Sequence, residues 1–273
     1  MSRIQFIEIH EQPWFPSPIR DEITDALQFG LNFLRAYGPI VPLLQRLLDS
    51  TCSGSVVDLC SGGGGPWFDL VRRVTSRNLN GEGSCLQIWL TDKYPNHGAH
   101  QNLGASSRNS VTYYPGSVDA MNVPAELKGL RTMFTSFHHF SPEEACAVLQ
   151  NAVDAGEGIG IFEITRRAAS AIAMVYLWAL MLTICTPWIR PFRWSRLLWT
   201  YLVPVIPFVL LFDGTVSCLR SYRPAELREI VTGLTGREYE WDIGEQRTGK
   251  VPVNYLIGYP RPSSSLPGLT QSE

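Results

Sequence analysis

Residues 56–67 read Val-Val-Asp-Leu-Cys-Ser-Gly-Gly-Gly-Gly-Pro-Trp, and this order predicts a strand, a glycine loop and a helix. The β-branched pair Val56-Val57 is typical of a buried strand. Pro66 suits the first position of a helix, and the glycines before it let the backbone approach a ligand closely. Open α/β sheets bind ligands at the carboxyl ends of their strands. We therefore expect a ligand at this loop.

The spacing of the glycines excludes two common nucleotide loops. A dinucleotide fingerprint needs a third glycine at the position that Trp67 or Phe68 occupies here. A phosphate-binding P-loop needs a Gly-Lys-Ser/Thr sequence, and none follows. What remains is an acidic residue followed by small residues at every second position, namely Asp58, Cys60, Gly62 and Gly64.

This pattern resembles the first motif of class I S-adenosylmethionine-dependent methyltransferases of the small-molecule type. Cys60 stands where the family most often has glycine, which is a mild departure because the position needs a small residue. The resemblance implies S-adenosylmethionine as the cofactor, with its methionine part held by the loop. A glycine-rich turn without a ligand is the alternative, and the strand–loop–helix context favours the ligand. The implied loop contacts are Asp58, Cys60, Ser61, Gly62, Gly63 and Gly64.

Two further acidic residues follow in the order that the family uses. A helix over 66–74 is expected to stop near Asn80-Gly81, and a second strand over 86–92 ends in Asp92, where family members bind both ribose hydroxyls. A third strand over 111–115 precedes Asp119, where family members often bind the adenine amino group. The cofactor contacts implied beyond the loop are Asp92, Lys93, Ser117, Asp119, Ala120 and Ser136.

The remaining elements complete a Rossmann-like α/β sheet. We expect strands over 131–137, 158–164, 237–243 and 253–259, and a helix from the capping box Ser141/Glu144 to Gly156. The resemblance implies seven strands in the order 3-2-1-4-5-7-6, with the last strand antiparallel and helices on both faces. The predicted divisions are amino-terminal cap helices (1–50), a cofactor-binding core (51–167), an apolar helical insertion after strand 5 (168–218), the rest of the sheet (219–261) and a disordered tail (262–273).

The insertion is unusually apolar. No residue from Ala168 to Ile189 is charged, arginines and aromatic residues alternate over 190–196, and a second apolar run over 197–212 contains two prolines. The first run reaches the ~20 residues that a transmembrane helix needs. Because both ends rejoin one sheet, the membrane geometry open to it is a hairpin that enters and leaves on the same side. We favour the alternative, a cap over the active site that is soluble or touches a membrane surface through 168–212, and either form favours a hydrophobic acceptor.

Composition limits the class of partner and compartment. The net charge is −2 and the basic residues are scattered, so no basic stripe for nucleic acid is present. The six cysteines form no Cys-x-x-Cys pair, so no metal is expected. The segment Met1–Arg20 does not read as a signal peptide. We expect a cytoplasmic protein that acts on a small molecule, with membrane association through 168–212 as the open alternative.

The predicted activity is O-, N- or C-methylation of a small hydrophobic or lipid-like acceptor. His138 is the candidate base, with Glu163 orienting it, because adjacent side chains on an extended strand end point to opposite sides and only one faces the cofactor. A purely structural role for the histidine pair is the alternative. The predicted acceptor contacts are Trp14, Tyr37, His139 and Tyr176. A membrane-associated binder of S-adenosylmethionine without transfer, or another transferase or cyclase with this cofactor, stays open.

Overall fold

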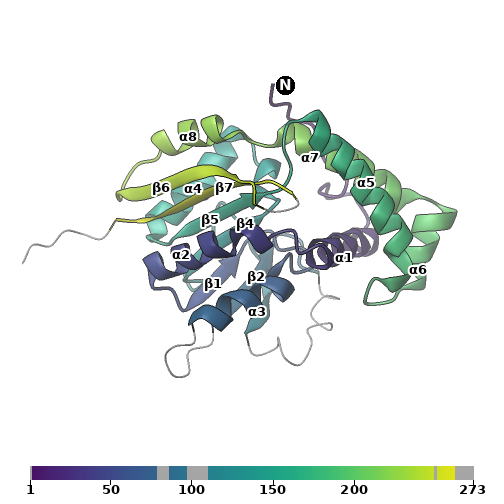
Figure 1. Cartoon of the computed structure of the whole chain (residues 1–273), viewed down its shortest axis with the longest axis horizontal. Helices are drawn as coiled ribbons and strands as arrows, with labels where there is room; N and C mark the ends of the chain where they lie inside the picture. Colours follow the sequence, from purple (N-terminus) through teal and green to yellow (C-terminus); the bar gives the residue numbers. More distant parts are fainter. Residues whose placement is uncertain (1, 79–85, 97–109, 249–250, 262–273) are drawn as a thin grey trace, which may run out of the picture.

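A seven-stranded sheet forms the centre of the molecule, in the order β3-β2-β1-β4-β5-β7-β6 (Figure 1). The computed structural model describes residues 2–78, 86–96, 110–248 and 251–261. The strands β1 to β5 run parallel, and β7 is antiparallel to both of its neighbours, β5 and β6. The predicted strand order is confirmed. The strands are β1 (Ser55–Asp58), β2 (Gln87–Asp92), β3 (Val111–Ser117), β4 (Leu130–Phe134), β5 (Ile159–Glu163), β6 (Tyr239–Gln246) and β7 (Val253–Pro260).

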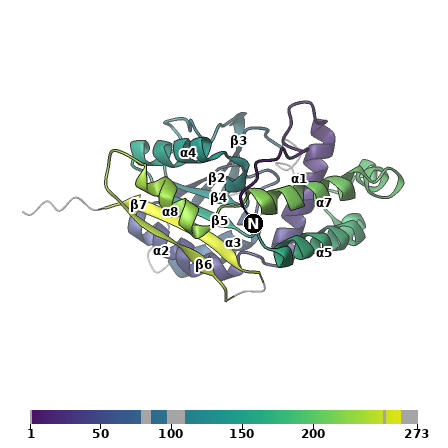
Figure 2. The same ribbon diagram turned by 90° about the horizontal axis from the view of Figure 1, so that it is seen from above.

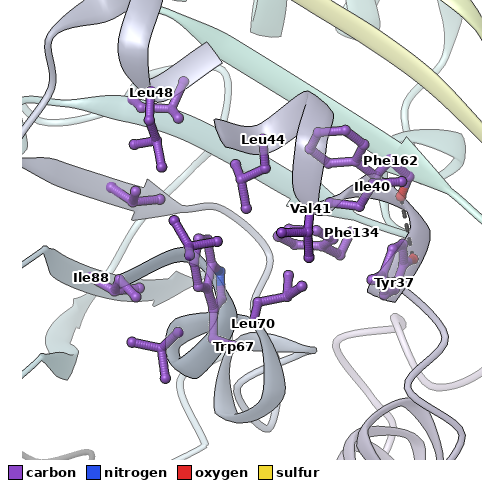
Figure 3. Packing of buried hydrophobic residues seen from close by; sticks show 14 of the residues in the cluster. Tyr37, Ile40, Val41, Leu44, Leu48, Trp67, Leu70, Ile88, Phe134 and Phe162 are labelled. Atoms are coloured by element: carbon purple, nitrogen blue, oxygen red, sulfur yellow. Dashed lines mark hydrogen bonds between the residues drawn. The ribbon is translucent and has the colours of Figure 1, made fainter. Parts of the chain in front are cut away.

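Helices cover both faces of the sheet, and alternate residues of each strand feed the two cores. Val56 belongs to the core under α2 (Val41–Thr51) and α3 (Trp67–Asn78), whereas Val57 belongs to the core under α4 (Pro142–Ala155) and α8 (Pro224–Thr232). Figure 3 shows the first core, in which Trp67 and Leu44 meet the strands. Burial on both faces explains the near-continuous apolar runs of β1 and β5.

The helix α4 has the predicted ends. Ser141 Oγ accepts from the Glu144 N–H at 3.3 Å, and the Glu144 carboxylate accepts from the Ser141 N–H at 2.8 Å. Gly156 closes the helix at φ +71°, a left-handed conformation that glycine adopts without a Cβ penalty. The expected stop at Asn80-Gly81 and the tail over 262–273 lie outside the described residues.

The fourth strand is shorter than predicted. It ends at Phe134, and Phe137–His139 form a 3-10 turn instead of a strand end. The cause is Thr135, whose φ of +48° turns the chain after its N–H has bonded to Phe162 O at 2.8 Å. His138 and His139 therefore do not lie on an extended strand end, and the prediction that they do is wrong.

A helical cap lies beside the carboxyl edge of the sheet (Figures 1 and 2). It consists of α1 (Ser17–Phe33), α5 (Ala169–Cys185), α6 (Trp194–Leu197) with the turn η5 (Leu198–Leu202), and α7 (Val205–Arg220). A core of its own joins α1, α5 and α7 through residues such as Ile23, Leu182 and Val209. Gly30 allows close approach, because a Cβ there would lie 2.6 Å from the Trp178 ring. The amino-terminal helix and the insertion thus form one unit.

Candidate active site

The glycine loop starts from a buried carboxylate. Asp58 ends β1 and accepts hydrogen bonds from Thr132 Oγ1 and Ser61 Oγ, both at 2.6 Å. Burial raises the pKa of Asp58 to about 7, although both hydrogen bonds oppose that shift. These bonds tie the start of the loop to Thr132 of β4, so the role of Asp58 is to position the loop.

The loop backbone needs left-handed conformations that few residues adopt. Cys60, Gly62 and Gly64 have φ of +56°, +52° and +107°. Glycine takes these angles without strain, whereas a residue with a Cβ is strained at a positive φ. The φ at Cys60 explains why glycine is the more usual residue at this position of the resembling family.

Asp92 connects the loop to the next strand. Its Oδ2 accepts from the Gly62 N–H and its Oδ1 from the Tyr94 N–H, each at 2.8 Å. Burial raises the pKa of Asp92 against the pull of these two hydrogen bonds. Further along the same edge, Asp119 accepts from the Met121 N–H at 2.9 Å and lies 3.4 Å from Lys93 Nζ. The carboxylates predicted for ribose and adenine thus lie at neighbouring strand ends.

A cavity of about 620 Å³ opens over this edge, between the strand ends and the cap. Its walls include segments of α1, α5 and α7, with apolar side chains such as Leu27, Trp178 and Leu210. Most of the predicted site residues line it: Asp58, Cys60, Ser61, Gly62, Gly63, Asp92, Lys93, Asp119, Ala120, Ser136, His138 and His139.

Two predicted cofactor contacts lie outside the cavity wall. Gly64 packs in the core, where a Cβ would lie 2.7 Å from both Phe68 and the Tyr113 hydroxyl. Ser117 Oγ donates to Lys93 O at 2.8 Å. Both residues shape the loops that carry their neighbours.

The structure does not bring three of the predicted acceptor contacts to the cavity. Trp14 and Tyr176 are 69% and 52% exposed and do not line the cavity. Tyr37 is buried against Phe134, and its hydroxyl contacts Thr135 Oγ1. The same hydroxyl donates a hydrogen bond to Phe162 O at 3.3 Å (Figure 3). These three residues were predicted from their aromatic character, but their side chains lie at the surface or in the core. Among the four predicted acceptor contacts, His139 lines the cavity.

His138 and Glu163 come together as predicted. His138 Nδ1 lies 2.7 Å from Glu163 Oε2, and the Phe137 N–H donates to Glu163 Oε1 at 2.7 Å. His138 Nε2 is buried and has no hydrogen-bond partner among the described residues. A second carboxylate, Glu8, lies 3.5 Å from Nε2.

The amino-terminal segment brings charges that sequence reasoning missed. Glu8 is 1% exposed and meets His139 Nε2 at 3.3 Å and Arg220 Nη1 at 3.5 Å. Glu11 meets His139 Nδ1 at 2.5 Å and Arg220 Nη1 at 3.1 Å. On the same segment His10 Nδ1 lies 2.7 Å from Asp213 of α7.

These contacts set the charge states of the cluster. Burial alone would raise the pKa of Glu8, but the charge of His139 and its hydrogen bond hold that pKa well below its usual range. The same contacts bring the pKa of Glu11 to about 2, again against burial. Burial disfavours charge on His139, yet Glu11 and Glu8 together raise its pKa well above its ordinary value. For Glu163, burial is outweighed by the interaction with His138 and the hydrogen bond between them, so the pKa of Glu163 is lowered.

The cluster has the donor types of a metal site. Donor atoms of Glu8, His138 and His139 lie within 4.8 Å of one another. Imidazole and carboxylate together suit several divalent metals. Here Arg220 already places a cation beside the Glu8 carboxylate, so the ionic network accounts for the arrangement. Three of the five histidines of the chain, His10, His138 and His139, meet in this cluster. The signal for it in the sequence was the run Glu8-Ile-His10-Glu11, which places two acids and a histidine within four residues.

No protein-family model and no curated protein matches the sequence. Solved structures do match. The plantazolicin methyltransferase BpumL in complex with SAH is similar at a TM-score of 0.58 and 11% identity, over 93% of this chain and 95% of that one. Human N-acetylserotonin methyltransferase in complex with SAM is similar at 0.51 and 13%, over 95% of this chain and 63% of that one.

A third structure is the O-methyltransferase NcsB1 from neocarzinostatin biosynthesis, in complex with SAH and 1,4-dihydroxy-2-naphthoic acid. It is similar at 0.51 and 16% identity, over 88% of this chain and 58% of that one. The chain thus spans nearly all of the plantazolicin enzyme and about three-fifths of the other two. At these identities the likeness establishes the fold, which is that of class I S-adenosylmethionine-dependent methyltransferases.

Proposed function

We propose that the protein transfers a methyl group from S-adenosylmethionine to a small hydrophobic acceptor. The observation that carries the proposal is one cavity lined by the glycine loop, Asp92 and His138, the histidine that Glu163 holds by a hydrogen bond. Cofactor-loop residues and a candidate base thus face the same space. The fold and the SAM- or SAH-bound neighbours support the cofactor assignment.

The cofactor site fits this molecule by its donors. Asp92 offers a half-buried carboxylate at the end of β2 that lines the cavity, which suits a pair of ribose hydroxyls. Asp119, beside Ala120 and Met121, suits an exocyclic amine further along the edge. The left-handed loop at Gly62 brings backbone rather than side chains to the cavity. When bound, S-adenosylmethionine supplies a methyl group on a cationic sulfur.

The residues of this chain then have three tasks. The cap encloses the acceptor and excludes water, and holding the acceptor in line can supply several kcal/mol of the rate enhancement, up to about 7–11 in favourable cases. Glu163 keeps the hydrogen on Nδ1 of His138, which leaves the Nε2 lone pair to take a proton from the acceptor. Glu8, 3.5 Å from that Nε2, then faces the charge that the imidazole acquires.

The acceptor side of the cavity is apolar. Ile23, Leu27 and Leu31 of α1, and Val175 and Trp178 of α5, line it. Burying apolar surface contributes about 25 cal/mol per Å², so a ring system or an alkyl chain suits these walls. A hydroxyl or amine on that acceptor would be directed toward the polar end at His138.

The alternative is a protein that binds S-adenosylmethionine without transfer. Calorimetry with the cofactor tests binding, and release of S-adenosylhomocysteine in the presence of a lipid extract, with a labelled methyl donor, tests transfer. We expect both from the wild type and a large loss of both from Asp92→Ala. Absence of binding, or a preference for a nicotinamide dinucleotide, would overturn the proposal. Binding without any labelled product, over a broad acceptor set, would favour the non-catalytic alternative.

A further inference from the structure

The outer face of the cap is apolar and exposed to solvent. On α5 the exposed residues Ala173, Leu177, Leu180 and Ile184 recur every three or four positions, so they share one side of the helix. Leu177 and Ile184 are 60% and 59% exposed. The helix Ala169–Trp188 is long and apolar enough to cross a membrane, and little of it is buried inside the protein.

The neighbouring elements continue this character. Phe208, Leu211 and Phe212 are exposed on α7, which packs beside α5. At the far end of the cap, Trp194 is 77% exposed and Leu202 75%. Figures 1 and 2 show these elements projecting together from the side of the sheet. A group of exposed apolar side chains of this size marks an interaction site.

The charges of the cap select the kind of partner. Between residues 168 and 219 the charged residues are Arg190, Arg193, Arg196 and Asp213. Three of them form ion pairs: Arg196 with Asp25 at 2.7 Å, Arg193 with the same carboxylate at 3.6 Å, and Asp213 with His10. Arg190 is exposed between Trp188 and Phe192, and Arg193 is half-buried. The segment 168–219 therefore presents the positive charge of Arg190 beside aromatic rings and no exposed acid, a pattern that suits anionic lipid headgroups.

The inner contacts of the cap decide how it meets a membrane. Trp178 of α5 packs on Gly30 of α1 and lines the cavity, and Gly214 of α7 packs on Val175. A helix that crossed a bilayer would lose these contacts with the core. The pair Trp194–Leu202 and Val205–Arg220 is also bent by 73°. A helix layer lying at the interface keeps the cavity closed and buries the outer face.

We propose that the outer face of residues 173–212 docks onto an anionic lipid bilayer and takes its acceptor from that bilayer. The first half of this inference is independent of catalysis, and the second half rests on the proposed methyl transfer. Met174 links the two, because it is 45% exposed and also lines the cavity. The wall of the acceptor cavity thus reaches the face that meets the lipid.

Flotation of the full-length protein with vesicles tests the docking. The vesicles are pure phosphatidylcholine or phosphatidylcholine with phosphatidylglycerol, and the test variant is Trp194→Ser/Leu202→Ser. Both side chains are mostly exposed, so the folded core does not depend on them. Phe33→Ser is the matched control, because Phe33 is 62% exposed but lies on α1, outside the proposed face. We expect binding to favour the anionic vesicles and to fall about tenfold or more in the double variant, since two large apolar side chains no longer enter the interface.

Three outcomes would overturn the inference. The first is that the wild type stays at the bottom of both gradients, and the second is that the double variant floats like the wild type. The third is that the wild type binds no vesicles but forms a dimer in detergent-free buffer, and that the double substitution dissociates this dimer. The last would assign the face to a second copy of the chain. S-adenosylmethionine affinity, measured on the same samples, shows separately whether the proposed function holds.

Discussion

His138 Nδ1 lies 2.7 Å from Glu163 Oε2, and this contact sets the direction in which the imidazole can act. Because Nδ1 carries the hydrogen that the carboxylate accepts, Nε2 is the free acceptor of the ring. The contact joins the 3-10 turn after β4 to the end of β5. Two adjacent parallel strands therefore assemble the candidate base.

This relationship predicts how turnover depends on the pair. His138→Gln should lower kcat by about 10²–10⁴-fold for an acceptor that loses a proton, the usual contribution of a general base. Glu163→Gln keeps a hydrogen-bond acceptor for Nδ1 and should cost less. S-adenosylmethionine affinity should change little in either variant. The measurement is product formation under cofactor saturation, with calorimetry and thermal unfolding in parallel.

His10→Gln is the control for this series, since His10 lines the same cavity but contacts Asp213. We expect it to retain most of its turnover. His139→Gln should chiefly lower stability, because Glu8 and Glu11 lose the charge that faces them. Equal turnover in His138→Gln and His10→Gln, at unchanged affinity, would remove the base from the mechanism.

A second prediction concerns Asp92. Asp92→Ala should weaken S-adenosylmethionine binding by about 1.5–3 kcal/mol, or roughly 10- to 150-fold, because it removes a charged hydrogen-bond acceptor in a shielded site. Asp119→Ala should cost less, since Lys93 already lies 3.4 Å from the Asp119 carboxylate and partly neutralises it. Calorimetry with the cofactor measures both. A larger loss from Asp119→Ala than from Asp92→Ala would contradict the order of the two contacts.

The backbone of the site followed from local sequence signals. The loop at Gly62, the acid at the end of β2 and the capping box at Ser141 each depend on residues close together in the chain. Strand order came from resemblance to a family whose topology is constant. These features were predictable because short-range chemistry determines them.

The charged cluster was not predictable in this way. Glu8 reaches His138 and Arg220 across sequence separations of more than 100 residues, through an irregular segment with no periodic pattern. Likewise, aromatic character alone did not separate Tyr37, which fills the core, from Trp178, which lines the cavity. Tertiary packing decided both positions. The turn at Thr135 ended β4 early for the same reason, because a positive φ in threonine has no strong local signal.

A third prediction uses the raised pKa of Asp58, about 7 in the folded protein. The unfolded group has an ordinary pKa near 3.9, so the folded state binds more protons between these values. Asp58 therefore stabilises the fold less as pH rises, and from pH 5 to pH 8 its contribution should fall by about 2.5 kcal/mol. In Asp58→Asn this component should be absent. Denaturant unfolding at both pH values measures it, and an unchanged pH dependence in the variant would contradict the assignment.

The last prediction tests the contact between α1 and α5. A Cβ at Gly30 would lie 2.6 Å from the Trp178 ring and 2.9 Å from Leu182. Gly30→Ala gains about 1 kcal/mol of helix propensity, whereas overpacking in a filled core costs about 1–3 kcal/mol. We expect a net loss of stability and, because Trp178 lines the cavity, a raised acceptor KM with kcat and cofactor affinity nearly unchanged. Gly54→Ala is the matched control, since a Cβ there meets nothing within 4 Å. Unfolding and steady-state kinetics of both variants decide the point: a Gly30→Ala protein as stable as Gly54→Ala, with the same KM, would show that the cap does not depend on this approach.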